Sequence, residues 1–388
     1  MVERKEYLEQ LLEWKDEHII KVVTGIRRCG KSVLLEQFKD RLHLAGVEAE
    51  QIISINFEDL EFEELLDYKV LYRYIKERLC SDKMTYIFLD EIQNVPDFPK
   101  VVDSLYVKNN TLLSGRYVEI SMLPLSFREY VTVTGRQQED AFSEYMQTGG
   151  LPYVAVMNRT DEKVNQYLEG IYNTVIVKDI EERQARKEKD AGKRKITDIA
   201  LLKTIARYLA SVIGSPISMK SVTDYLISSG RKISPNTVSD YVEALTESFV
   251  FYPAERFDIV GKQLLKANKK LYMVDLGLRN HILPRKRYDL GFSIENIVYF
   301  ELLRRGYKVN IGKFGSTGVD FVAQKQGILT YYQVTANMTA EETFEREMRP
   351  LRGIQDNYEK IVLTLDRFSL GNYEGIKVMN VIDWLLGI

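Results

Sequence analysis

The segment GIRRCGKS at residues 25–32 constrains this chain more than any other part of it. It matches the pattern G-x-x-x-x-G-K-S, follows the apolar run IIKVVT and precedes the helical pattern SVLLEQFKDRL. Gly25 and Gly30 permit a tight turn, and successive backbone N–H groups at the start of a helix can surround phosphate oxygens. This order of strand, loop and helix predicts a phosphate-binding loop. The ligands we expect are ATP or ADP, with Mg²⁺.

Each residue of the loop has an expected part in this site. Lys31 is expected to contact the β- and γ-phosphates, and Ser32 to ligate Mg²⁺. Arg27 and Arg28 are candidates to touch phosphate or a neighbouring element, and Cys29 is small enough to fit within the loop. The nucleotide-binding residues we predict are Gly25, Ile26, Arg27, Arg28, Cys29, Gly30, Lys31, Ser32 and Val33.

A second element, YIFLDEIQ, ends an apolar run in two acidic residues. We expect Asp90 to hold Mg²⁺ through water, and Glu91 to polarise the attacking water as general base. An acidic pair at the end of a strand is otherwise a solvated strand terminus. The phosphate loop upstream favours the catalytic interpretation.

Arg116, in SGRYVEI, is a third catalytic candidate. An arginine at the start of a strand can stabilise charge on the γ-phosphate, within one chain or across a subunit boundary. A surface arginine in a loop is an equally good interpretation.

The fold class that the pattern predicts is α/β, with a parallel sheet in the first third. Apolar runs at 19–24, 51–56, 85–90 and 116–121 lack strict alternation, as strands buried on both faces of a parallel sheet do. Helical patterns separate them. After Phe127 further helical patterns resemble a lid, and a dense charge run at 181–195 predicts a domain boundary. The domains we expect are 1–135 (nucleotide-binding core), 136–190 (helical lid and linker), 191–287 (winged helix) and 288–388 (small mixed α/β domain).

Three helical patterns and a hairpin-like stretch between 196 and 287 outline a winged helix. Ser234 is the expected N-cap of the third helix, with Pro235 at its first position. A local basic patch makes double-stranded DNA a candidate partner, at even odds with a protein partner. The third helix presents Asn236, Ser239, Asp240 and Glu243, which disfavours base readout and favours salt-dependent backbone contacts. The basic residues are Lys220, Arg231, Lys232, Lys262, Lys266, Lys269 and Lys270.

Composition excludes several classes of protein. Lys and Arg total 54 against 56 Asp and Glu. The net charge of the whole chain therefore gives no long-range electrostatic attraction to DNA or acidic membranes. Cys29 and Cys80 form no disulfide framework, the charged N-terminus is unlike a signal peptide, and no run is long enough to span a membrane. These features predict a cytoplasmic protein without a membrane role. No Cys/His spacing fits zinc, and we expect Tyr72, Tyr74 and Tyr167 to serve packing.

The segments GIRRCGKSVLL, INFED, YIFLDEIQNVPDF, LSGRYVEISMLPLSFREY and GGLP, in this order, resemble AAA-type ATPases of bacteria and archaea. These ATPases carry a C-terminal domain of unknown function, the DUF4143 group. In the back half the resemblance rests on ENIVYFELLRRGY, GVDFVA, YYQVT and RPLRGIQDNYEKIVLTLD, where the domain is similar to the PD-(D/E)xK nuclease fold. The resemblance covers nearly the whole chain and implies ATPase activity in a nucleic-acid-related setting.

The chain departs from this family before the SGR segment. Family members carry a further strand there that ends in a polar sensor residue, whereas here Asn110 runs directly into TLLSGR. Either the protein lacks the strand or a stretch is absent from the sequence. The first alternative puts hydrolysis, though not binding, in question.

A second departure lies in the nuclease-like domain. Asp320 fits the first carboxylate and Glu295 an upstream acid, but the next strand reads Gln333-Val-Thr335 where the family resemblance requires E-x-K. Metal-dependent cleavage needs clustered carboxylates, and usually a lysine. We therefore expect a nuclease-like fold without cleavage activity.

Three hypotheses for the whole chain follow. The first is an ATP-hydrolysing protein that couples its nucleotide state to a DNA-related recognition module. The second is a slow NTPase signalling switch that oligomerises with a protein partner and needs no DNA. A homo-oligomer is a separate candidate assembly of the chain. The third, a nuclease gated by ATP, is disfavoured by Gln333 and Thr335.

Overall fold

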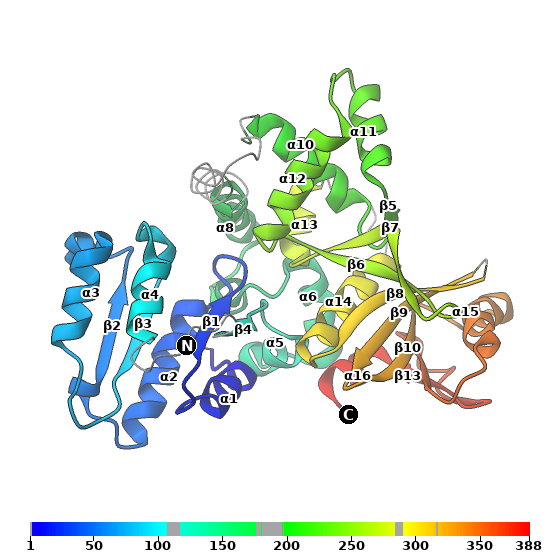
Figure 1. Cartoon of the computed structure of the whole chain (residues 1–388). Coiled ribbons are helices and arrows are strands. Elements are labelled where there is room, and N and C mark those ends of the chain that lie inside the picture. The colour runs from blue at the N-terminus through cyan, green and yellow to red at the C-terminus, as the bar shows by residue number, and fades with distance from the viewer. Residues whose placement is uncertain are drawn as a thin grey trace. The chain divides into compact units, whose positions relative to one another are not determined.

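The computed structural model describes residues 2–106, 117–175, 180, 196, 198–283, 290–315 and 317–388, and Figure 1 shows its helices and strands. By their contacts they form two compact units. The first consists of Met1–Thr24 with Gly30–Met122, and the second of Gly25–Cys29 with Leu123–Ile388. Five residues of the predicted phosphate loop therefore pack with the second unit, although the chain on either side of them belongs to the first.

The first unit has the alternation of strands and helices that the sequence predicts. Each predicted strand is present within one residue of its expected start. Its main elements are α1 (Lys5–Glu13), β1 (Ile20–Thr24), α2 (Lys31–Leu44), β2 (Ile52–Asn56), α3 (Tyr68–Glu77), β3 (Tyr86–Asp90), α4 (Phe98–Tyr106) and β4 (Tyr117–Ser121).

The four strands do not form the single sheet that we expected. β1 pairs in parallel with β4, and β2 pairs in parallel with β3, as two separate two-stranded sheets. Among the described residues no strand joins β1 to β3, so each keeps a free edge. Val22 in the middle of β1 is 36% exposed, unlike a strand buried on both faces. The prediction of one sheet was wrong because strand pairing depends on a neighbour that the local pattern does not reveal.

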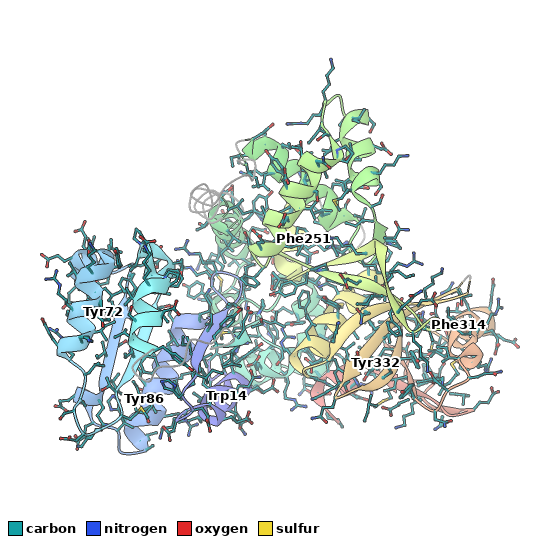
Figure 2. All side chains as sticks on the ribbon, in the orientation of Figure 1. Trp14, Tyr72, Tyr86, Phe251, Phe314 and Tyr332 are labelled. Carbon is teal, nitrogen blue, oxygen red and sulfur yellow. The ribbon has the colours of Figure 1, made fainter. Side chains whose placement is uncertain are left out.

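The core of the first unit lies between β2, β3 and the helices α3 and α4. Ile53 and Ile55 of β2 pack with Leu71 and Ile75 of α3, and all four are buried. Asp67 begins α3 by accepting hydrogen bonds from the backbone N–H groups of the next turn. Tyr72 and Tyr74 are partly buried against this core, as predicted, and Figure 2 shows Tyr72 among the side chains of this unit.

The second unit begins with helices that match the predicted patterns closely. The N-cap of α12 is Ser234, whose side chain accepts a hydrogen bond from the Thr237 backbone N–H. Three helices that we did not predict are α7, α13 and α15. The helices are α5 (Phe127–Thr134), α6 (Gln138–Thr148), α7 (Pro152–Val156), α8 (Asp161–Tyr172), α10 (Ile199–Ser211), α11 (Met219–Ser228), α12 (Pro235–Glu247), α13 (Leu276–Ile282), α14 (Leu290–Arg304), α15 (Glu341–Gly353) and α16 (Val381–Leu386).

A nine-stranded sheet runs through the back half of this unit. The strand order is β12-β13-β11-β10-β9-β8-β6-β7-β5, and α14 and α15 pack against its C-terminal strands. β6 pairs in parallel with β8, so one sheet contains strands from both sides of residue 287. Whether a domain boundary lies at 287/288 stays a prediction. The strands are β5 (Pro216–Ile217), β6 (Phe251–Asp258), β7 (Gln263–Met273), β8 (Lys308–Phe314), β9 (Thr317–Lys325), β10 (Ile328–Thr335), β11 (Glu359–Thr364), β12 (Gly371–Tyr373) and β13 (Ile376–Asn380).

No helix in the described part of the chain combines the length and the apolar character needed to cross a bilayer.

Candidate functional site

The phosphate loop has the backbone that its glycines predict. Gly25 has φ 140° and Gly30 φ 104°, values that favour glycine. Arg28, with φ 70°, adopts a left-handed conformation that is uncommon for a residue with a side chain. Ile26 and Cys29 are fully buried. The loop is therefore anchored by two apolar side chains and turns sharply at three positions, as a loop that presents its backbone to phosphate must.

The residues after the turn begin α2. Gly30 is the N-cap of this helix, which starts at Lys31. Ser32 is exposed, and Lys31 and Val33 are half-buried, as is Arg27 earlier in the loop. The first N–H groups of a helix lack partners within it, so this end carries partial positive charge. The described geometry fits a phosphate group at this position.

Asp90 and Glu91 lie where the sequence placed them, at the carboxyl end of β3. Asp90 pairs with Asn56 of β2, and Glu91 has a left-handed backbone with φ 55°. The side chain of Gln93 donates a hydrogen bond to the Glu91 carboxylate. Because β3 and β1 belong to different sheets, no shared sheet brings this acidic pair to the loop. Arg116, the third catalytic candidate, lies outside the described residues, as does the segment around Asn110.

Glu119 is a residue near the loop that our sequence reasoning missed. The hydroxyl of Thr24, the last residue of β1, donates to Glu119 Oε1 at 2.7 Å. Ser121 Oγ lies 3.4 Å from the same hydroxyl. Ligands of open parallel sheets bind beyond the carboxyl ends of the strands, and β1 and β4 both end here. The segment YVEIS contained the signal, since an acidic residue interrupts its apolar pattern.

The GGLP segment is held by a buried carboxylate. Asp275 accepts a hydrogen bond from the Gly150 backbone N–H at 2.7 Å, and one from the Leu278 N–H at 3.0 Å. Gly149 has φ 76°, and a Cβ there would overlap the Asp275 carboxylate. Burial raises the pKa of Asp275 to about 6, although these backbone N–H groups oppose the rise. The motif thus requires its glycines because Asp275 fills the space beside them.

A buried charged cluster is formed by side chains of β7, β9 and α14. Lys270 Nζ on β7 lies 2.7 Å from Glu295 Oε1 and 3.8 Å from Asp320 Oδ1. Tyr272 donates its hydroxyl proton to the same Glu295 oxygen at 2.5 Å. Glu295 and Asp320 both lie beside Lys270, as the family resemblance implied. Lys270, which we had counted in a basic surface patch, is instead 8% exposed, and its single positive charge offsets part of theirs.

Gln333 completes this cluster. Its amide accepts from the Asp320 backbone N–H at 3.2 Å and donates to Glu347 Oε2 at 2.8 Å. Burial and the charge of Glu295 raise the pKa of Asp320 to about 7, against the opposing charge of Lys270. Burial alone would lower the pKa of Lys270, but Glu295 and Asp320 raise it. Among the described residues no three His, Cys, Asp or Glu side chains are grouped to hold a metal ion.

The surface of the three-helix segment keeps part of its predicted basic character. Arg231 pairs with Asp198 at 2.8 Å, while Lys220, Lys232 and Lys262 are exposed. The side chain of Lys266 lies outside the described part. On α12 the exposed residues are Asn236, Ser239 and Glu243, with Asp240 half-buried. The face of this helix therefore has the acidic character that the sequence predicted.

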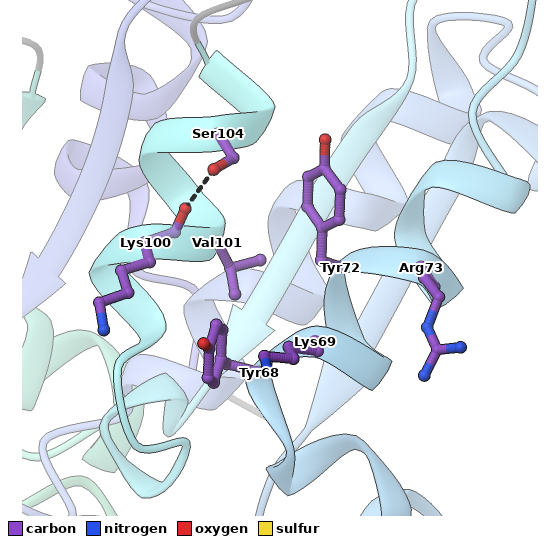
Figure 3. A pocket seen from close by; sticks show the side chains of 7 residues that line it. All are labelled: Tyr68, Lys69, Tyr72, Arg73, Lys100, Val101 and Ser104. Carbon is purple, nitrogen blue, oxygen red and sulfur yellow. Dashed lines mark hydrogen bonds between the residues drawn. The ribbon is translucent and has the colours of Figure 1, made fainter.

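A shallow groove lies between α3 and α4 in the first unit (Figure 3). Its volume is about 320 Å³. The Tyr72 ring stands between the two helices, and Lys100 and Arg73 extend outward on either side. The groove contains none of the predicted nucleotide-binding residues. Its lining residues are Tyr68, Lys69, Tyr72, Arg73, Lys100, Val101 and Ser104.

Comparison with family models identifies two regions. Residues 17–112 match the model described as AAA domain, which contains the loop and Asp90, and supports a nucleotide-binding ATPase. Residues 139–289 match a model described as Domain of unknown function (DUF8612). The DUF4143 resemblance of the back half stays a prediction.

Two curated proteins resemble the chain over most of its length. An uncharacterized protein of Haemophilus influenzae is 37% identical over 411 aligned positions, covering 100% of this chain and 99% of that protein. The uncharacterized protein MJ1544 of Methanocaldococcus jannaschii is 27% identical over 414 positions, covering 94% of this chain and 85% of that protein. Since this chain has 388 residues, at least 23 positions of the 411 have no residue here.

Two solved structures are more distant. The Walker-type ATPase PABY2304 of Pyrococcus abyssi is 14% identical, with a TM-score of 0.40, over 73% of this chain and 96% of that one. The Orc1 protein of Aeropyrum pernix, in complex with DNA, is 13% identical, with a TM-score of 0.25, over 73% of this chain and 92% of that one. Both TM-scores lie below 0.5.

Proposed function

Because this chain belongs to the same family as the Haemophilus influenzae protein and carries an AAA domain, we propose that it binds ATP in the loop at 25–32 and hydrolyses it. The observation that carries the proposal is the loop itself. Its three positive φ angles at Gly25, Arg28 and Gly30, and its place directly before α2, suit a phosphate chain.

In this proposal, individual residues of the chain have separate roles in ATP hydrolysis. Lys31 neutralises the β- and γ-phosphates, and Ser32 with Asp90 would hold Mg²⁺. When bound, Mg²⁺ supplies positive charge that offsets charge developing on the transferred phosphate. Glu91, oriented by Gln93, takes the proton of the attacking water. Arg116 stabilises the γ-phosphate charge.

The nucleotide state is coupled, in this proposal, to recognition by the second unit. Exposed Lys220, Lys232 and Lys262 are the contacts for the phosphate backbone of double-stranded DNA. The acidic face of α12 argues against base readout, so DNA affinity should fall steeply with salt. Fluorescence anisotropy of labelled DNA duplexes of unrelated sequence, mixed with the protein at two salt concentrations, measures both the sequence dependence and the salt dependence of DNA affinity.

A second candidate function is a slow switch that stays bound to nucleotide and oligomerises. In the described part of the first unit the strands form two two-stranded sheets, so that Asp90 and the loop share no sheet there, and this favours the switch. The sequence left open whether the sensor strand is lacking, and its lack would be a further reason for slow turnover.

Calorimetric titration with Mg-ATP tests the proposal at the level of binding. Wild-type protein should bind ATP, and Lys31→Ala should bind at least 10-fold more weakly because a contact to the phosphates is lost. Lys39→Ala, on the same helix, is the matched control and should bind as wild type does. Equal affinities of the wild type and Lys31→Ala would refute the loop as the nucleotide site.

A further inference from the structure

The groove between α3 and α4 is lined by aromatic rings and cations and by no acidic residue. Lys69 and Arg73 line it from α3, and Lys100 lines it from α4. The rings of Tyr68 and Tyr72 stand between these cations (Figure 3). Both rings pack against the buried core of the first unit, which holds them in place. The groove therefore combines an apolar floor with a positively charged rim.

The cations of this rim are positioned by the rings, and most of them lack a carboxylate. The Lys69 ammonium lies 5.8 Å from the centroid of the Tyr68 ring, and the Lys100 ammonium lies 5.5 Å from the same centroid. Such cation–π contacts orient an ammonium without neutralising its charge. Of the three lining cations, only Lys100 forms an ion pair with a described residue, Asp97, at 3.3 Å. The rim can therefore accept carboxylates from another molecule.

The segment directly before α3 has the opposite charge. Leu60–Leu66 form a short 3₁₀ helix, and its first residue, Leu60, is 82% exposed. Glu61, Glu63 and Glu64 are exposed as well, and no described cation pairs with any of these three carboxylates. An exposed leucine among unpaired carboxylates is complementary, in charge and in apolar character, to the groove.

We propose that this acidic segment of one copy of the chain docks in the groove of a second copy. The segment and the groove both belong to the first unit, so two copies related by a two-fold axis can make the same contact twice. Leu60 would lie against the Tyr72 side of the groove, with Glu63 and Glu64 facing its cations. Exposed ion pairs alone contribute little, so the burial of Leu60 supplies much of the affinity. A second copy is favoured over an unrelated acidic protein because the complementary segment is present on the same unit. The proposal is independent of ATP binding.

Sedimentation velocity of the full chain without nucleotide tests the proposal, in a concentration series that reaches about 200 µM, where even a weak dimer is populated. The groove variant carries Lys69→Glu and Arg73→Glu, and the segment variant carries Glu63→Lys and Glu64→Lys. Each variant alone should dimerise at least 10-fold more weakly than the wild type, because like charges then meet. An equal mixture of the two should regain the wild-type affinity, because a reversed groove then faces a reversed segment. Misfolded variants could not show this recovery.

Two further variants complete the experiment. Lys5→Glu with Arg41→Glu, on α1 and α2, changes the net charge by the same amount as the groove variant and should dimerise as the wild type does. Leu60→Ala should weaken the dimer by about 10-fold. A wild type that stays monomeric throughout the series, or a mixture that associates no more tightly than its components, would overturn the proposal. A monomeric wild type that binds a single-stranded oligonucleotide, with binding lost in the groove variant, would also overturn it and would assign the groove to nucleic acid.

Discussion

Asp275 and Gly150 are 125 positions apart, and the carboxylate of the first accepts a hydrogen bond from the backbone N–H of the second at 2.7 Å. The same carboxylate binds the Leu278 N–H at the start of α13. One side chain thus joins two distant segments of the second unit, and it is 3% exposed.

Replacing Asp275 by alanine should destabilise the second unit by about 2–4 kcal/mol, because buried N–H groups would lose their acceptor. Asp198→Ala is the matched control, since Asp198 also binds an N–H at a helix start but is half exposed; it should cost about 1 kcal/mol. Urea denaturation followed by circular dichroism measures both. Equal losses for the two variants would show that burial adds nothing to the Asp275 contacts.

Lys270→Met should destabilise the protein by about 3–5 kcal/mol, because it leaves Glu295 and Asp320 buried without their counter-ion. Lys269→Met, at the neighbouring half-buried position, should change stability by less than about 0.5 kcal/mol. Adding Glu295→Gln to Lys270→Met should restore part of the loss, since one of the unpaired charges disappears. A double variant no more stable than Lys270→Met would count against the ion cluster.

Asp320 should make stability depend on pH in a defined direction. Its pKa is raised from 3.8 to about 7, so the folded chain retains a proton that the unfolded chain releases above about pH 4. The stabilisation is complete below that pH and is lost as the pH rises to 7. Relative to Asp320→Asn, the wild type should therefore lose on the order of 4 kcal/mol of unfolding free energy between pH 4 and 7. Thermal unfolding of both proteins at several pH values in this range measures the difference in stability. If the stability of the two proteins changed equally with pH, the raised pKa of Asp320 would be contradicted.

We expect no nuclease activity from the cluster around Asp320. Gln333 stands where the family resemblance calls for an acid, and among the described residues no three His, Cys, Asp or Glu side chains are grouped to hold a metal ion. Incubation of plasmid and linear DNA with the protein and Mg²⁺ or Mn²⁺ should give no cleavage. Cleavage that disappears in Asp320→Ala would overturn this expectation.

The sequence predicted the parts of this fold that depend on neighbours along the chain. The loop at 25–32, the strand ending at Asp90 and the Ser234 cap all follow from local patterns, and all are present in the structure. Contacts between residues that are distant in the sequence could not be predicted from local patterns. The burial of Lys270 requires Glu295 on another element, and the charge of Lys270 suggested a surface position instead.

The pairing of strands shows the same limit. Apolar runs in the sequence identified the strands β1 to β4. Such a run does not show which strand it pairs with, and the described strands form two sheets where we predicted one. The role of Asp275 was equally hidden, although the GG pair of GGLP marked a place where backbone lies close to another group. Glu119 was not predicted because its partner, Thr24, lies 95 positions away in the sequence.

The central claim is that this chain hydrolyses ATP at the loop, and steady-state phosphate release tests it most directly. Wild-type protein, Lys31→Ala and Glu91→Gln are compared with Mg-ATP, with and without double-stranded DNA. The account predicts turnover by the wild type that both variants lose and that DNA raises. Wild-type protein that binds ATP but releases phosphate no faster than Glu91→Gln would contradict hydrolysis, and would leave the nucleotide as the ligand of a switch.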